Sequence, residues 1–302
     1  MNQHSSLTKF KQWVELKDYR PATKSRYVSE LWKLIEHFGG PDPSSLTEDQ
    51  LRQYFLHLRQ ELQASPSVMK AAKWSLRCFY RDCLKRTDWV VFDELRIAEP
   101  RTVPVVLSRE QVQRIFSCVR EPRFLMCLRL MYYCGLRISE ALNLQVRHID
   151  SKAQPPRLHI RNGKGGKDRF VPLPKPLLEE LRAWWQTHRN PKLLFPCPGK
   201  SKQGPVVDKP IKETLASMSA ASVQNVFRLA QRAGGINSEA TPHTLRHSYA
   251  THLLEEGISL RQIQEYLGHE SIETTAIYLH LTAISESRTQ EALHRLYQPC
   301  HL

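Results

Sequence analysis

Apolar residues in the first third of the chain recur every three or four positions, which is the period of an α-helix. One such stripe runs through "RPATKSRYVSELWKLIEHFGG" (20–40) and ends at two glycines, and a second runs through "SLTEDQLRQYFLHLRQEL" (45–62). Thr47 and Gln50 occupy capping-box positions at the start of the second stripe. The pattern predicts a helical domain over residues 1–97.

A third helix is predicted over residues 67–86, and it carries a row of basic side chains. Lys70, Lys73, Arg77 and Arg81 follow one another at helical spacing and therefore share a face. Such a row is either a solvated surface or a strip that contacts phosphate groups. The charge of the whole chain, described below, favours the strip, so we predict that these four residues bind DNA.

The pattern changes after residue 97. Residues 98–107 contain two prolines and no period, which is typical of an extended linker. In "RLHIRNGKGGKDRFVPLP" (157–174) apolar and polar residues alternate on either side of a glycine-rich turn, which predicts a β-hairpin. Helical patterns fill most of the remainder, including 242–256 and 260–280. We therefore predict a mainly α protein with a small β-sheet, whose second domain spans residues 108–302.

The composition indicates the kind of partner. The chain has 302 residues with 44 Lys and Arg against 30 Asp and Glu, a net charge of +14. Residues 1–97 contribute +4 and the rest +10, so both parts can meet the same polyanion, and nucleic acid is the commonest one. No apolar run is long enough to span a membrane, and no export signal is evident. We expect a cytoplasmic protein with no membrane partner.

Metal and disulfide chemistry are not expected. The seven cysteines are an odd number with no CxxC pair, which argues against a disulfide framework and against a zinc knuckle. His243, His247 and His252 have no acidic or cysteine partner at ligand spacing. We predict no metal and no cofactor.

Two short stretches place polar residues where the helical and strand patterns break. In "CGLRISEAL" Arg137 follows Gly135 at the junction of two helices, and Glu140 lies one turn later. Arg137 can either cap helix carbonyls or grip two oxygens of one phosphate. In the hairpin turn "GKGGKDR", Lys164 and Lys167 are either solvated or carried into a groove as ammonium groups.

Two further stretches carry imidazoles, an arginine and a phenol. In "TPHTLRHSYATHLLEEG" His243 and Arg246 are three residues apart in the first turn of a helix, where the dipole and unpaired N–H groups favour an anion. In "LGHESIETTAIYLH" His269 precedes Tyr278 by nine residues. A single tyrosine is usually a packed aromatic, and only its company with the basic residues favours a nucleophile.

Together these residues suit phosphoryl transfer. Two arginines and a lysine can neutralise the charge that develops on a transferred phosphate. Imidazoles can hydrogen-bond its oxygens or move protons, and a phenol can act as a nucleophile whose phosphate ester conserves the energy of the broken bond. Because the arginines neutralise the charge that a metal ion otherwise would, no Mg²⁺ is needed.

The four stretches, in this order and at these spacings, resemble the sequence boxes of the tyrosine recombinase (phage integrase) family. The helical region around residues 20–39 is similar to the SAM-like core-binding domain of that family, so the resemblance covers nearly the whole chain. It is closest to Xer-type and mobile-element integrases. Residues 190–221 do not match the additional helix of integron integrases, which favours a general integrase.

The resemblance implies a role for each basic residue of the site. Arg137 and Arg246 would contact the scissile phosphate, and Glu140 would orient the site. Lys164 would protonate the leaving 5′-oxygen of the DNA, with Lys167 as the rival for that role.

It also implies the covalent step. Tyr278 would attack the phosphate and form a 3′-phosphotyrosine link, while His243 and His269 would contact the phosphate or act as acid and base. Members of the family act as tetramers on two DNA recombination sites and pass through a Holliday junction. An accessory protein or a partner recombinase can take part, and a tail helix within residues 284–302 can dock in cis or in trans.

Two other readings remain open at this point. A type IB topoisomerase or a resolvase would use the same kind of site. A DNA-binding architectural protein without activity would lack at least one catalytic residue. All six are present in this sequence: Arg137, Lys164, His243, Arg246, His269 and Tyr278.

Overall fold

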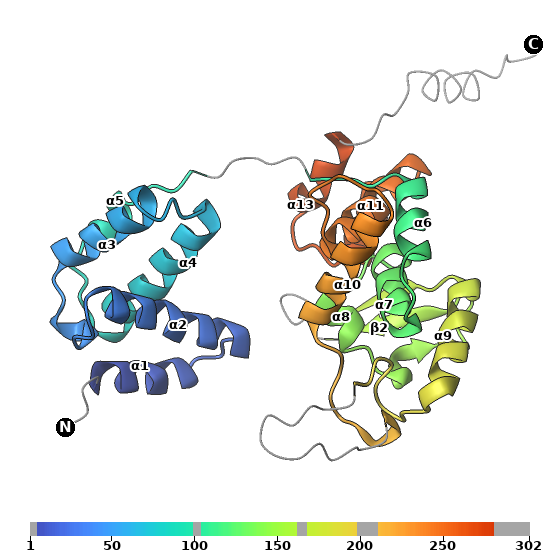
Figure 1. The fold of residues 1–302 in the computed structure, drawn as a ribbon, viewed down its shortest axis with the longest axis horizontal. Coiled ribbons are helices and arrows are strands. Elements are labelled where there is room, and N and C mark those ends of the chain that lie inside the picture. The colour runs from blue at the N-terminus through green and yellow to red at the C-terminus, as the bar shows by residue number, and fades with distance from the viewer. Residues whose placement is uncertain (1–4, 99–103, 162–167, 198–210, 281–302) are drawn as a thin grey trace, which may run out of the picture. The chain divides into compact units, whose positions relative to one another are not determined.

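The computed structural model describes residues 5–98, 104–161, 168–197 and 211–280. The chain divides into two compact units, Met1–Thr102 and Val103–Leu302 (Figure 1), and each is described by itself. No helix among the described residues is both long and apolar enough to cross a membrane.

Unit 1 is helical. Its elements are α1 (Ser5–Glu15), α2 (Pro21–His37), the 3-10 turn η1 (Pro43–Ser45), α3 (Glu48–Gln60), α4 (Pro66–Arg77), the π-helical turn η2 (Cys78–Cys83) and α5 (Val91–Glu94). The predicted capping box of Thr47 and Gln50 is confirmed at the start of α3. Phe10, Leu34 and Leu51 are fully buried, so the apolar stripes read from the sequence form one core.

The helix predicted over residues 67–86 is correct in its first part only. α4 ends at Arg77, the chain continues as the π-helical turn, and the helical segment stops at Cys83. The sequence pattern has no signal for this change, because a π turn keeps the apolar residues Phe79 and Tyr80 buried as an α-helix would.

Unit 2 combines helices with one small sheet. Its elements are α6 (Arg109–Ser117), α7 (Pro122–Tyr133), α8 (Ile138–Leu142), η3 (Val146–His148), β1 (Ile149–Asp150), β2 (Arg157–Ile160), β3 (Arg169–Pro172), α9 (Lys175–His188), η5 (Ile211–Glu213), α10 (Ala220–Ala233), α11 (Pro242–Glu255), α12 (Leu260–Leu267), α13 (Glu273–Ala276) and η6 (Ile277–His280).

The predicted hairpin is part of a three-stranded antiparallel sheet in the order β1-β2-β3. Leu158 of β2 pairs with Val171 of β3 and with Ile149 of β1. β1 has two residues, which is too short to show the alternation by which strands are recognised in a sequence.

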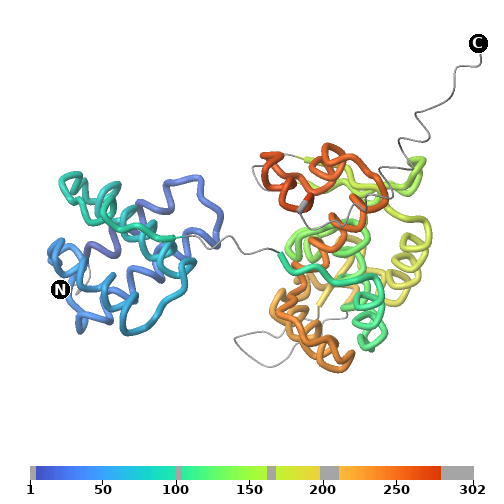
Figure 2. Tube along the Cα trace, turned by 90° about the horizontal axis from the view of Figure 1, so that it is seen from above, coloured from blue at the N-terminus to red at the C-terminus, as the bar shows by residue number. Residues whose placement is uncertain are grey.

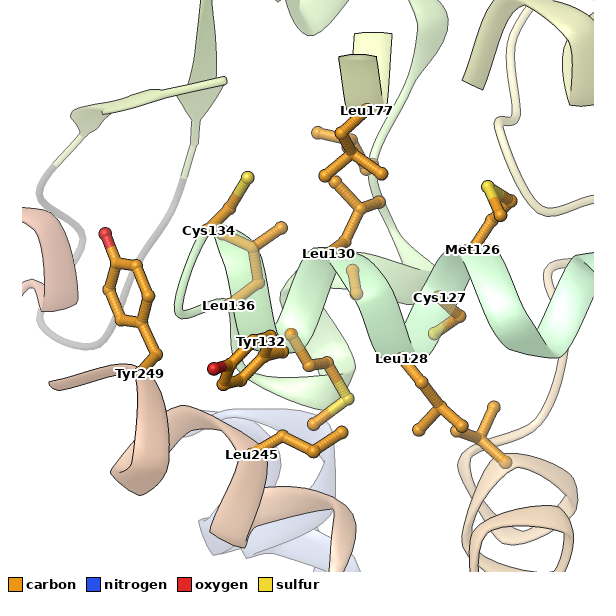
Figure 3. Close-up of a cluster of buried hydrophobic side chains, with 14 of the residues drawn as sticks. Met126, Cys127, Leu128, Leu130, Tyr132, Cys134, Leu136, Leu177, Leu245 and Tyr249 are labelled. Carbon is orange, nitrogen blue, oxygen red and sulfur yellow. The ribbon is translucent and has the colours of Figure 1, made fainter. Parts of the chain in front are cut away.

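The core of unit 2 forms around α7, which is apolar on nearly all sides and correspondingly buried. Figure 3 shows Leu130 and its neighbours on α7 between Leu177 of α9 and the α11 residues Leu245 and Tyr249. α7 packs against both α9 and α11. This core fixes α11, which carries two of the predicted site residues.

The prediction of one helix over residues 260–280 is wrong. α12 ends at Leu267 and is capped by Gly268, whose φ of +62° is the left-handed conformation that closes helices and that glycine adopts without strain. The chain then forms α13 and η6, and η6 packs against α11 (Figures 1 and 2). The break places His269 in a loop and Tyr278 on a separate short element.

Candidate active site

The seam between α7 and α8 is shaped by Gly135. Its φ is +59°, and a side chain there would come within 2.6 Å of the ring of Tyr249. Glycine therefore lets the backbone approach α11, and its carbonyl oxygen accepts a hydrogen bond of 2.5 Å from Nη1 of Arg246.

Arg137 stands at the N-cap of α8. Its backbone N–H donates to Oε2 of Glu140 at 2.8 Å, and its Nη1 donates to Oε1 of the same residue, also at 2.8 Å. The structure thus pairs Arg137 with Glu140, rather than with the carbonyls of the preceding helix. The side chain of Arg137 is 21% exposed, so part of it faces solvent.

Glu140 lies at the centre of a group of arginines. Arg169, in β3, donates to it from both Nη1 (3.0 Å) and Nη2 (2.7 Å), and Nη1 of Arg246 lies 3.8 Å from Oε2. Burial raises the pKa of Glu140, but the hydrogen bonds and charge of Arg169, helped by Arg137 and Arg246, lower it to about 2. Glu140 is therefore a carboxylate at neutral pH.

The side chain of Arg246 is buried and fixed by hydrogen bonds to two backbone carbonyls. Its side chain is 2% exposed, and Nη2 donates to the carbonyl of Leu267 at 2.6 Å, in addition to the bond from Nη1 to Gly135. Burial, reinforced by the charge of Arg137, lowers the pKa of Arg246 to about 9. It remains a cation at neutral pH.

His269 connects Arg246 to the segment that precedes Tyr278. Its Nε2 lies 3.2 Å from Nη2 of Arg246, and its Nδ1 lies 2.9 Å from Oγ1 of Thr275. Because a guanidinium only donates, Nε2 accepts and Nδ1 carries the proton that is donated to Thr275. Burial and the charge of Arg246 lower the pKa of His269 to about 3, so the ring is neutral.

Tyr278 is 1% exposed, and its hydroxyl lies 2.9 Å from Nδ1 of His247. Its ring is also nearly parallel to that of His269, with centroids 6.5 Å apart. Burial raises the pKa of Tyr278, although the charges of Arg246 and Arg137 oppose the shift. Burial likewise lowers the pKa of His247 to about 4, so a neutral imidazole holds a protonated phenol.

His243, the last of the predicted site residues within the described part of the chain, lies on the first turn of α11. Its ring meets that of His247 edge to face at 5.4 Å, and the residue is exposed. Desolvation and the charges of Arg246 and Arg137 lower its pKa. The predicted start of a helix at residue 242 is confirmed, and Thr241 is its N-cap.

The structure thus brings five predicted residues together around one cluster and adds His243 at its edge; the five are Arg137, Glu140, Arg246, His269 and Tyr278. Lys164 and Lys167 lie outside the described residues. Arg169 and His247 also contact this cluster, and neither was predicted to belong to it. Arg169 lies two positions after Lys167 in the hairpin motif, and His247 lies one turn after His243, but this spacing does not indicate which distant side chains they contact.

Three of the four basic residues that were predicted to bind DNA make contacts within unit 1. Lys73 donates to the carbonyl of Leu95 at 2.8 Å, and Arg81 forms two bonds to the carboxylate of Asp93. Arg77 lies over the ring of Trp74 at 5.2 Å. These contacts hold the fold of unit 1 and leave less of the row to face a partner.

Lys70, the first residue of the row, lines a hollow in unit 1. This hollow of about 770 Å³ lies between α2 and α4, and Arg26, Tyr27 and Trp74 also line it. Cations beside aromatic rings and hydroxyl groups are the combination that contacts nucleic acid backbones and sugars. Within the described part of the chain, no cluster of His, Cys, Asp and Glu could hold a metal ion.

Comparison with known proteins gives matches over both units. Residues 105–284 match the Phage integrase family, and residues 7–89 match the phage integrase N-terminal SAM-like domain. The chain is 32% identical to the tyrosine recombinase XerA of Thermococcus kodakarensis, over 94% of each chain. It is 30% identical to an integrase/recombinase of Escherichia coli, over 96% of this chain and 93% of that protein.

A solved structure shares the fold. A lambda integrase tetramer bound to a Holliday junction matches with a TM-score of 0.69 at 16% identity, over 91% of this chain and 76% of that one.

Proposed function

This chain belongs to the phage integrase family of tyrosine recombinases, and on that premise we propose that Tyr278 cuts and rejoins DNA strands through a 3′-phosphotyrosine link. The protein is a tyrosine-type site-specific DNA recombinase. Its substrate in this proposal is a pair of double-stranded DNA recombination sites.

One observation supports this assignment of residues above the others. Next to the phenol of Tyr278, Arg137, Arg169 and Arg246 surround the single carboxylate of Glu140. Three positive charges against one negative leave a surplus of two. A phosphodiester carries one negative charge, and its transition state gains more, so the preorganised surplus stabilises the transition state more than the ground state.

The proposed reaction assigns a step to each of these residues. The oxygen of Tyr278 attacks the phosphorus while the bond to the 5′-oxygen breaks, and the leaving oxygen takes a proton from Lys164. Arg137 and Arg246 stabilise the non-bridging oxygens, and His243 and His269 contact the phosphate. The reverse reaction, with a 5′-hydroxyl of another strand as nucleophile, rejoins the DNA and releases the tyrosine.

The proton of the phenol has a defined neighbour. His247 is the hydrogen-bond partner of Tyr278 before DNA binds, but its pKa of about 4 makes it a weak base in that state. A phosphate placed beside the imidazoles favours their protonated forms and so raises their pKa values. DNA binding therefore makes the histidines of this cluster better proton acceptors.

The assembly is proposed on the same premise. A tetramer on two DNA sites would exchange one pair of strands, form a Holliday junction and exchange the other pair, and the lambda integrase tetramer on such a junction supports this arrangement. The cytoplasm is the proposed location, and an accessory protein or partner recombinase can join the complex. Deleting residues 284–302, outside the described residues, should weaken strand exchange more than DNA binding if that tail acts in trans.

Covalent trapping tests the proposal. Nicked suicide duplexes that tile the DNA flanking the gene are incubated with the protein in EDTA, and products are separated on a denaturing gel. An adduct that forms with the wild type and is lost in Tyr278→Phe supports metal-free attack by Tyr278. An adduct that persists in Tyr278→Phe would assign the attack to another residue, and an adduct that needs Mg²⁺ would contradict the metal-free step.

A further inference from the structure

Arg169 is a buried cation to which the sequence analysis gave no role. Its side chain is 9% exposed. Each of its three nitrogens has a partner inside the protein: Nη1 and Nη2 donate to the two oxygens of Glu140, and Nε donates to the carbonyl of Tyr266 at 2.8 Å. These three hydrogen bonds therefore link Arg169 to neighbouring segments of the protein.

These partners lie on the segments that carry the site. Glu140 is the hydrogen-bond partner of Arg137, and Tyr266 precedes His269 by three residues at the end of α12. Arg169 itself is the first residue of β3, the strand that follows the hairpin turn. One side chain therefore ties a strand, the start of α8 and the end of α12 to one another.

The side chain of Arg169 also lies close against the backbone of Gly268. A Cβ on Gly268 would lie 2.9 Å from Cδ of Arg169 and 3.2 Å from its Nε. The stem of the arginine thus rests directly on the glycine that precedes His269. A residue so placed can set where the loop of His269 sits relative to Glu140.

Arg169 also decides how the charge of Glu140 is shared. With Arg169 in place, both oxygens of the carboxylate receive a two-pronged bond from a largely buried guanidinium group. Without Arg169, the negative charge of Glu140 acts on Arg137 and Arg246 alone and offsets part of the positive charge that they offer to the phosphate. The surplus charge of the cluster drops from two to one.

We propose that Arg169 is a positioning residue for strand cleavage, which holds Arg137 through Glu140 and the His269 loop through the end of α12, and which leaves the charge of both phosphate-binding arginines available to the DNA. This inference rests on the proposed function of the site. It assigns Arg169 no contact with the DNA.

The test compares Arg169→Gln with Arg157→Gln on the duplex that gives the wild-type adduct. Arg157 is a matched control on β2 of the same sheet, where it pairs with Asp150 at 3.1 Å and its side chain is 46% exposed. At saturating DNA, Arg169→Gln should form the adduct about 100-fold more slowly, the usual cost of a small displacement of catalytic groups. DNA affinity should change little, and Arg157→Gln should keep the wild-type rate.

Two further readouts separate positioning from general damage to the fold. The double variant Glu140→Gln with Arg169→Gln should be no slower than the slower single variant, because both act through one contact. In Arg169→Gln the carboxylate of Glu140 loses its main partner, so its pKa rises and adduct formation should fail at a higher pH on the acid side than in the wild type. That shift should vanish in the double variant.

A wild-type rate in Arg169→Gln, rate losses that multiply in the double variant, or an unmoved acid limb would each overturn the inference. If Arg169→Gln does not fold by circular dichroism, Arg169→Lys, which keeps the charge and loses the fork, undergoes the same three measurements. Absence of any wild-type adduct would instead contradict the proposed function itself.

Discussion

Each unit contains a carboxylate whose pKa lies at about 2, yet the two are held by different donors. Burial raises the pKa of both, and hydrogen bonds overcome it. In unit 1, Asp42 accepts from backbone N–H and hydroxyl groups, such as those of Ser44 at 2.9 and 2.6 Å. In unit 2, Glu140 accepts from guanidinium groups, those of Arg169 foremost.

The two kinds of donor show that a lowered carboxylate pKa does not by itself indicate a functional site. Neutral donors stabilise the charge of Asp42 without adding any, so that cluster has no positive charge to offer and serves the 3-10 turn that it caps. The arginines around Glu140 outnumber it and leave positive charge beside a tyrosine. The charge that remains after pairing, more than the perturbed pKa itself, marks the functional site.

The largest expected difference in cleavage rate is between two arginine substitutions, one in each unit. Arg137→Gln deletes a phosphate ligand of the proposed site and should slow adduct formation by about 10³-fold or more. Arg81→Gln, in unit 1, deletes an arginine that is also paired with a carboxylate, Asp93, and should leave the rate at saturating DNA unchanged. Single-turnover trapping measures both, and equal losses would erase the distinction between the two units.

The hairpin turn allows a similar contrast between two lysines. Lys164→Ala should slow cleavage by about 100-fold, because general acids contribute at least that much, while Lys167→Ala should change it little. A substrate with sulfur in place of the bridging 5′-oxygen needs no proton to leave and should restore the rate of Lys164→Ala. Rescue of Lys167→Ala instead would exchange the two roles.

Substitution of the two carboxylates, Asp42 and Glu140, should have smaller and different effects. Asp42→Ala should cost about 1 kcal/mol of stability, the usual value of a lost N-cap, with no change in the cleavage rate. Glu140→Gln should slow cleavage by about tenfold or more, since the arginines lose their shared anchor. Thermal unfolding and single-turnover trapping of both variants give the two numbers, and a slower rate in Asp42→Ala would break the comparison.

The pH dependence has the same sign for both groups. Because each pKa lies below its value in the unfolded chain, the stabilisation is present above about pH 4.5 and is lost as the pH falls towards 2. Wild-type stability should therefore drop over this range, and less steeply in Glu140→Gln than in the wild type. Denaturant unfolding at pH 6, 4 and 3 measures the slope, and an identical slope in the variant would contradict the pairing of Glu140.

The smallest effect concerns DNA affinity. Lys70→Ala should lower the slope of log affinity against log salt by about one, as expected for one lost phosphate contact. Lys73→Ala should change it less, because Lys73 is not among the residues that line the hollow between α2 and α4. The order would be wrong if Lys73→Ala had the larger effect.

The sequence predicted the helical units, the hairpin and most of the cluster, because periodicity, capping residues and motif spacing are local properties. The break after α12 was not predicted, although the sequence shows Gly268 at that point. A glycine within a helical pattern adopts a left-handed φ only when tertiary contacts favour it, so the glycine alone does not predict a break. The roles of Arg169 and His247 depend on partners 29 and 31 residues away, and no local spacing encodes such pairs.

Peptide mapping of the trapped adduct identifies the nucleophile without relying on any substitution. The adduct is digested with protease and nuclease, and the nucleotide-bearing peptide is sequenced by mass spectrometry. We expect a nucleotide joined through its 3′-phosphate to Tyr278, with a free 5′-hydroxyl on the other DNA end. A nucleotide on any other residue, or a 5′-phosphate linkage, would contradict it.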